Sequence, residues 1–168
     1  MSDIASAATG WEERLSALLT LFGHRNWIVV ADAAYPAQAS AGIETIVASA
    51  DQVSVLRKIL DGIGASKHVR ARVYLDDELS FVPELDAPGV VNYRAELDVL
   101  LAGFASCRLP HEQIIARLDQ SAQVFRILII KTDMTIPYTS VFFELDCGYW
   151  NAEAERRLHE AILKARAE

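Results

Sequence analysis

Apolar residues at helical spacing, together with residues typical of helix ends, predict five helices along the chain. Across Trp11–Phe22 they fall three or four positions apart, as on the buried face of a helix. The same pattern follows Asp51, which can cap a second helix, and Pro110, which suits a first helical turn. Residues 95–105 and 151–167 complete the set of predicted helices.

Short runs rich in β-branched residues between these helices predict four strands. The run Val69–Leu75 alternates between apolar and other side chains, which is the period-two pattern of a strand. Trp27–Ala31 is apolar throughout, as strands covered by helices on both faces tend to be. The other two runs are Val124–Ile130 and Val141–Leu145. This mixture predicts one layered α/β domain over residues 1–168, with the last predicted helix appended to it.

Composition and charge narrow the class of protein. The 168 residues, 52% hydrophobic and 23% charged, are enough for one domain with a sizeable core. The net charge of −7 gives no reason to expect binding to nucleic acid or to an acidic membrane surface. The N-terminal residues lack the pattern of a secretory signal, no apolar run approaches the ~20 residues of a membrane span, and the two cysteines have no metal-like spacing. We therefore expect a soluble cytoplasmic protein with free thiols.

The stretch Gly23–Pro36 contains polar residues that a buried strand does not need. His24 lies between the first predicted helix and the strand. Asp32 follows eight positions later, at the carboxyl end of the strand, where open α/β sheets usually bind ligands. A histidine titrates near neutrality and can give and take protons, while an aspartate can accept a hydrogen bond from a substrate hydroxyl. The alternative is structural: His24 caps the helix C-terminus and Asp32 caps a turn.

Three further polar residues are candidates for a site. His111 lies at the start of the helix after Pro110, where a lone histidine is more often a surface residue. Tyr138 and Ser140 precede the last predicted strand and can supply hydroxyl groups, although such residues also occur in ordinary turns. The charge run Asp76–Glu78 is interpreted as a solvated turn. The sequence contains no nucleotide-binding glycine motif, no nucleophile elbow and no metal-type spacing of His and Cys.

Four segments, in the same order along the chain, resemble the family of D-ribose pyranases and L-fucose mutarotases (RbsD/FucU). The first is Gly23–Pro36, in which histidine and aspartate flank an apolar strand. The resemblance spans roughly Trp11–Leu145 and implies an RbsD-like three-layer α/β/α fold with a central mixed sheet. The other three segments are His111-Glu112-Gln113, the run VFRILIIKTD from Val124, and Pro137-Tyr138-x-Ser140.

The resemblance also implies an activity. Members of this family interconvert ring or anomeric forms of a free monosaccharide without a cofactor or a metal, and they form ring-shaped homo-oligomers, often decamers of stacked pentamers, with sites shared between neighbours. The matching positions make His24 the proton donor and Asp32 a sugar-binding carboxylate. Further sugar contacts are expected from His111, Tyr138 and Ser140. An imidazole suits one of the two proton transfers that open a hemiacetal ring.

Some positions depart from the family pattern. Asn26 stands where an acidic residue is usual, and Ser140 replaces the usual asparagine, an amide that can both donate and accept. The loop Met134–Pro137 also differs, and the helix from Asn151 extends past the end of typical members. Two other hypotheses therefore accompany the enzyme: a non-catalytic monosaccharide-binding or regulatory protein on the same fold, and an oligomeric structural domain without a sugar site.

Overall fold

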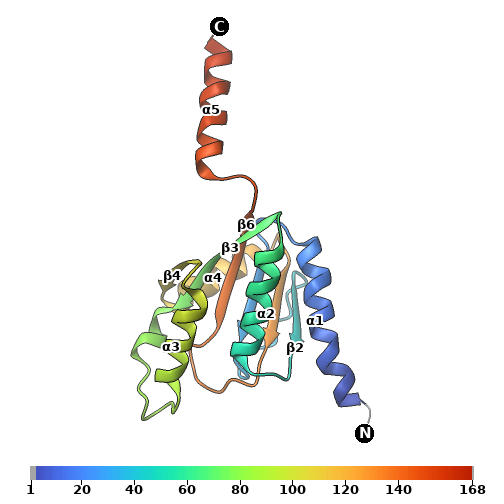
Figure 1. The fold of residues 1–168 in the computed structure, drawn as a ribbon, viewed down its shortest axis with the longest axis vertical. Coiled ribbons are helices and arrows are strands. Elements are labelled where there is room, and N and C mark those ends of the chain that lie inside the picture. Colours follow the sequence, from blue (N-terminus) through green and yellow to red (C-terminus); the bar gives the residue numbers. More distant parts are fainter. Residues whose placement is uncertain (1–2, 168) are drawn as a thin grey trace.

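A computed structural model describes residues 3–167, which form a six-stranded sheet flanked by helices (Figure 1). Helices and strands alternate along much of the chain, and one short 3-10 helix, η1, lies between β3 and α3. Their bounds in chain order are α1 Asp3–Leu21, β1 Trp27–Ala31, β2 Ile43–Val47, α2 Gln52–Ala65, β3 Val69–Asp76, η1 Asp77–Phe81, α3 Val90–Leu101, β4 Ala105–Leu109, α4 His111–Ala122, β5 Ile127–Lys131, β6 Val141–Cys147 and α5 Ala152–Ala167.

The sheet is mixed, because one strand runs against the other five. Its strand order is β2-β5-β1-β6-β3-β4. The strands β2, β5 and β1 pair in parallel, as do β3 and β4, whereas β6 is antiparallel to both β1 and β3. The carboxyl ends of five strands therefore lie at one end of the sheet, which we call the carboxyl end, together with the start of β6. The predicted central mixed sheet is confirmed.

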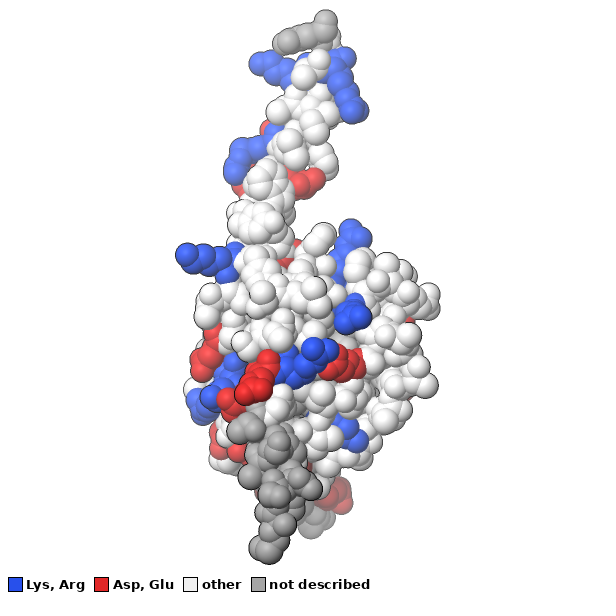
Figure 2. Space-filling model, turned by 90° about the vertical axis from the view of Figure 1, so that its right-hand side faces the viewer, with Lys and Arg blue, Asp and Glu red and all other residues white. Residues whose placement is uncertain are grey.

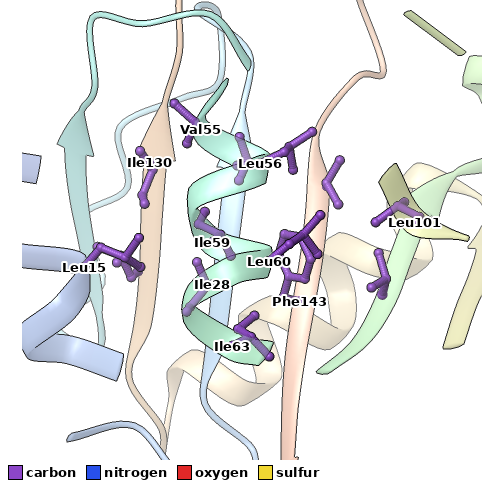
Figure 3. Packing of buried hydrophobic residues seen from close by; sticks show 14 of the residues in the cluster. Leu15, Ile28, Val55, Leu56, Ile59, Leu60, Ile63, Leu101, Ile130 and Phe143 are labelled. Carbon is purple, nitrogen blue, oxygen red and sulfur yellow. The ribbon is translucent and has the colours of Figure 1, made fainter. Parts of the chain in front are cut away.

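Helices cover both faces of the sheet, which gives the three layers that the resemblance implied. The larger core lies between the sheet and helices α1, α2 and α3, where α2 directs Leu56 and Ile59 toward the sheet residue Phe143 (Figure 3). On the opposite face, α4 packs Ile114 and Leu118 against alternate residues of the same strands. Because the strand residues alternate between two apolar cores, the run Trp27–Ala31 has no polar face.

The edge strands differ most from the sequence prediction. The predicted third helix, residues 95–105, is α3 from Val90 to Leu101, and the chain from Ala105 forms β4 instead. The hydrophobic pattern also does not predict β2, and it begins β5 at Val124 instead of Ile127. β2 and β4 lie at the two edges of the sheet, and their residues are half-buried or exposed. They therefore lack the apolar run that marks a central strand.

Helix α5 projects from the domain instead of packing on it (Figure 1). Its start is fixed by Asn151, which caps the helix: the Oδ1 of Asn151 accepts a hydrogen bond from the backbone N–H of Ala154 at 2.8 Å. The indole Nε1 of Trp150 also donates to Glu155 at 2.6 Å. Within residues 3–167, no helix combines the length and the apolar character that crossing a membrane requires.

Gly42 is a position where a side chain has no room. A Cβ atom there would overlap the backbone carbonyl oxygen of Ala122, which cannot rotate away. We expect Gly42→Ala to lower the free energy of unfolding by about 1–3 kcal/mol. The matched variant Gly64→Ala, in α2 with open space around it, should raise this free energy by about 0.5–1 kcal/mol. Urea unfolding measures both values, and equal stability of Gly42→Ala and the parent protein would contradict the close approach.

Candidate functional site

Most of the candidate residues come from segments that meet at the carboxyl end of the sheet. Because five strands point the same way, the loops after β1 and β3 lie beside the loop before β6. Asp32 follows β1, and Ser140 precedes β6 although it lies 108 positions further along the chain. His111 is the first residue of α4, directly after β4. Strand direction thus gathers side chains that are far apart in sequence.

A cavity of about 680 Å³ opens at the carboxyl end of the sheet. Four of the five candidate residues line it, namely Asp32, His111, Tyr138 and Ser140. A mostly apolar cavity with a few convergent polar groups is typical of small-ligand sites. The apolar residues around it are Ala33, Ala34, Pro36, Ile115, Met134, Ile136 and Pro137.

Asp32 has one oxygen with a structural role and one directed toward another segment. Its Oδ1 accepts a hydrogen bond from the backbone N–H of Ala34 at 2.9 Å, which caps the turn after β1. Its Oδ2 lies 3.5 Å from the hydroxyl of Ser140, at the limit of a hydrogen bond. The structural interpretation of Asp32 therefore accounts for one carboxylate oxygen and leaves the other beside the cavity.

His111 is held by two carboxylates, one from the end of β3 and one from η1. Its backbone N–H donates to both oxygens of Glu78, each at 3.0 Å, so Glu78 satisfies an amide in the first turn of α4. Its ring Nδ1 lies 3.0 Å from Oδ1 of Asp76. The interpretation of Asp76–Glu78 as a solvated turn is wrong for Asp76, which is the fully buried last residue of β3.

The environment of Asp76 changes its ionisation. Burial raises the pKa of Asp76 to about 6, although His111 opposes this effect by favouring the charged carboxylate. Its Oδ2 is buried and has no hydrogen-bond partner among the residues that the structure describes. When it is ionised, this carboxylate can accept a hydrogen bond from the Nδ1–H of His111, and in that tautomer of a neutral imidazole Nε2 carries no proton. The signal for Asp76 in the sequence was its place directly after Leu75, at the end of an alternating run.

Tyr138 has an unusual backbone conformation beside a firmly held neighbour. Its φ of 58° lies in the left-handed region, which non-glycine residues seldom adopt. The carbonyl oxygen of Thr139 accepts hydrogen bonds from Nε2 of Gln52 and, at 2.8 Å, from the hydroxyl of Tyr93. These buried partners anchor the loop, and the ring of Tyr138 lies edge-on to His111 with the ring centroids 5.8 Å apart.

Tyr35 belongs to the cavity although the sequence analysis did not include it among the candidates. Burial raises its pKa, and the nearby carboxylates of Asp119 and Asp76 raise it further, so the hydroxyl stays protonated at neutral pH. The Nε2 of Gln38 lies 3.5 Å from the hydroxyl oxygen. Tyr35 therefore supplies a hydroxyl donor on the wall that follows β1.

His24 lies at the amino end of β1, at the opposite end of the sheet from the other candidates. It is exposed in the turn between α1 and β1, and it lines a separate depression of about 210 Å³ with Arg72 and Glu144. A five-residue strand such as β1 spans roughly 16 Å, so His24 and the large cavity of one subunit are well separated. Asn26 closes this turn, because its Oδ1 accepts from the backbone N–H of Gly23 at 2.9 Å.

Comparison with known proteins identifies the family. The model of the RbsD / FucU transport protein family matches residues 11–147, and the chain therefore belongs to this family. The resemblance predicted from the four segments is confirmed, and helix α5 lies beyond the matched residues. A comparison with curated proteins gives no match.

Solved structures agree with this assignment at the level of the fold. RbsD from Bacillus subtilis, complexed with D-ribose, has a TM-score of 0.57 and 17% identity, over 79% of this chain and 91% of that chain. The fucose mutarotase from Streptococcus pneumoniae, in complex with L-fucose, has a TM-score of 0.51 and 18% identity, over 77% and 89%. FucU from Bifidobacterium longum gives 0.51 and 15%, over 80% and 94%.

Proposed function

We propose that this protein is a cofactor-independent monosaccharide mutarotase or pyranase, which interconverts anomeric or ring forms of a free sugar. The observation that carries the proposal is the convergence of Asp32, His111, Tyr138 and Ser140 on one cavity in a member of the RbsD / FucU family. The structures of relatives with D-ribose and with L-fucose support a monosaccharide as the ligand class. The cavity volume of about 680 Å³ falls in the range of small-molecule sites.

In this proposal the polar side chains of the cavity hold the sugar hydroxyls. The Asp32 carboxylate accepts a hydrogen bond from one hydroxyl, while the hydroxyls of Tyr138 and Ser140 can donate or accept. Because Asp76 holds Nδ1 of His111 as a donor, Nε2 is the acceptor for a further proton. Fixing several hydroxyls determines which atoms of the sugar ring face the groups that transfer protons.

His24 can take part in the reaction only from a second subunit, because the large cavity of its own subunit lies at the opposite end of the sheet. We infer that a neighbouring copy brings its His24 to the cavity, as in the ring-shaped oligomers with shared sites that the family resemblance implies. His24 then donates a proton to the ring oxygen as the bond from this oxygen to the anomeric carbon breaks. The anomeric hydroxyl gives its proton to Nε2 of His111, and reclosure of the ring reverses both transfers.

The alternative is a non-catalytic monosaccharide-binding or regulatory protein on the same fold. One observation favours it: the four residues proposed to bind the sugar all line the cavity of a single subunit, without His24. Sugar binding then needs no acid from a partner subunit. The two functions differ in whether the rate of sugar exchange rises above the uncatalysed rate.

Saturation-transfer NMR on the anomeric protons of free ribose, fucose, galactose, glucose and rhamnose tests the proposal. We expect enhanced exchange for one sugar. Asp32→Asn should lower that enhancement at low sugar concentration by about 10–100-fold, because a hydrogen bond to a charged group is lost. The matched variant Asp133→Asn, exposed and outside the cavity, should keep the rate of the parent protein.

Two negative results have different meanings. No enhanced exchange, together with a melting temperature that rises with a sugar, would contradict the enzyme and support the binding protein. No enhanced exchange and no sugar-dependent melting shift would contradict both functions. The remaining hypothesis would then be an oligomeric structural domain without a sugar site.

A further inference from the structure

We propose that helix α5 pairs with α5 of a second copy of this chain, as two antiparallel helices. The helix lies outside residues 11–147, so the fold of the family does not account for it. It projects from the domain and buries none of its residues (Figure 1). Its apolar residues nevertheless gather on one side, which we call the α5 stripe: Leu158, Ala161, Ile162 and Ala165.

The α5 stripe is exposed on a helix that buries none of the residues Ala152–Ala167. Leu158 and Ile162 are 43% and 36% exposed. Figure 2 shows uncharged surface between the charged side chains of the projecting helix, with basic side chains at its outer end and both acidic and basic ones nearer the domain. A lone helix of 16 residues is marginal in water, and most helices gain their stability by packing an apolar face. A helical partner for the α5 stripe would supply that packing.

The positions in the α5 stripe suit a two-fold axis. Leu158 and Ile162 lie near the middle of Ala152–Ala167, one on each side of its centre. An axis through this centre, perpendicular to the helix, places Leu158 against Ile162 of the partner subunit and the reverse. Such an interface is self-complementary, as pairs of identical subunits require.

The charges on α5 favour the antiparallel direction. Its first turn is acidic and its last turn is basic, through Glu153, Glu155, Lys164 and Arg166. Antiparallel helices bring unlike turns together and also oppose their dipoles, whereas parallel helices would bring like charges together.

One flank of the α5 stripe makes the match specific. At 100° per residue, Glu155 and Arg166 both lie about 60–80° to the same side of Leu158. The register that pairs Leu158 with Ile162 of the partner subunit places Glu155 within one position of Arg166 of the partner subunit. The two-fold axis repeats this ion pair, so each interface contains it twice.

Sedimentation of the full chain tests the pairing. Two helices of 16 residues offer a small interface, so the measurement covers a range of protein concentrations. At high concentration we expect the parent protein to have twice the mass of Leu158→Glu, which places a charge in the α5 stripe. Leu163→Glu introduces the same charge on the opposite side of the helix, and it should keep the mass of the parent protein.

Charge exchange tests the direction of the helices. Glu155→Arg and Arg166→Glu should each reduce the mass toward that of Leu158→Glu, because each brings like charges together. The double variant should restore the mass of the parent protein. Equal masses of the parent protein and Leu158→Glu would overturn the proposal. Loss of mass without restoration by the double variant would also overturn it and would assign the α5 stripe to another surface, such as the groove between α2 and α3 lined by Leu60, Leu100 and Phe104.

Discussion

Replacing His24 with alanine is expected to lower the rate of sugar exchange by about 10²–10⁴-fold, the usual contribution of one acid/base group. Sugar binding should survive, because the large cavity does not include His24. Folding should survive as well, since His24 is exposed and its replacement changes stability by no more than about 0.5 kcal/mol. Saturation-transfer NMR gives the rate, and the sugar-dependent melting shift gives the binding. His159→Ala, at an exposed histidine of α5, is the matched control and should keep full exchange.

A mixing experiment separates a shared site from a site within one subunit. His24→Ala and Asp32→Ala subunits, each expected to have reduced exchange alone, are expressed together so that they form mixed oligomers. If His24 acts across an interface, about a quarter of the sites contain both natural residues, and exchange returns to about that fraction. Exchange that stays at the level of the single variants would contradict the shared site. It would leave His111, with its carboxylate partner, as the acid/base group to test next.

Replacing Asp76 with asparagine is expected to make the protein relatively more stable as the pH rises. The pKa of Asp76 lies at about 6 in the folded protein, above the ordinary 3.8, because ionisation in the buried site is unfavourable. The protonated carboxyl therefore favours the folded state below pH 4, and this advantage is lost as the pH rises to 6. Asparagine does not ionise and avoids the loss. Between pH 4 and pH 8, the free energy of unfolding of Asp76→Asn should gain about 2–2.5 kcal/mol on that of the parent protein.

Urea unfolding at several pH values measures this gain. Asp77→Asn is the matched control, because Asp77 is the exposed neighbour of Asp76, and it should stay within about 0.5 kcal/mol of the parent protein at each pH. A constant difference between Asp76→Asn and the parent protein from pH 4 to pH 8 would contradict a desolvated carboxyl. Comparing exchange rates of the same variants then shows whether Asp76 also orients His111 for the reaction.

The central strands and the principal helices could be predicted from the sequence, because burial on two faces leaves long apolar signals. Trp27–Ala31 and Val141–Leu145 are strands as predicted, and the first is buried throughout. The edge strands could not be predicted in the same way. Ala105–Leu109 is largely exposed, so its side chains carry no periodic apolar signal, and it follows directly on the pattern of a helix.

The candidate site could be predicted in its residues but not in its arrangement. Asp32 and Ser140 come together only because β6 runs against β1, and strand direction has no local signal in the sequence. Asp76 was missed because a carboxylate beside two other acidic residues has the local pattern of a solvated turn. Its burial depends on the neighbouring strand and on α4, which brings His111 to it. The separation of His24 from Asp32, in contrast, is implied by the strand between them, and the structure adds that the other candidates lie at the Asp32 end of that strand.

The antiparallel course of β6 also determines how the protein could be used on a surface. The strand begins beside the cavity and finishes at the opposite end of the sheet, from which α5 leads away (Figure 1). A chip or bead attached through the C-terminal helix would therefore hold each molecule with its cavity toward the solution. Binding of free sugars could then be recorded on immobilised protein without blocking the entrance, while a linker at the turn after β1 would obstruct it.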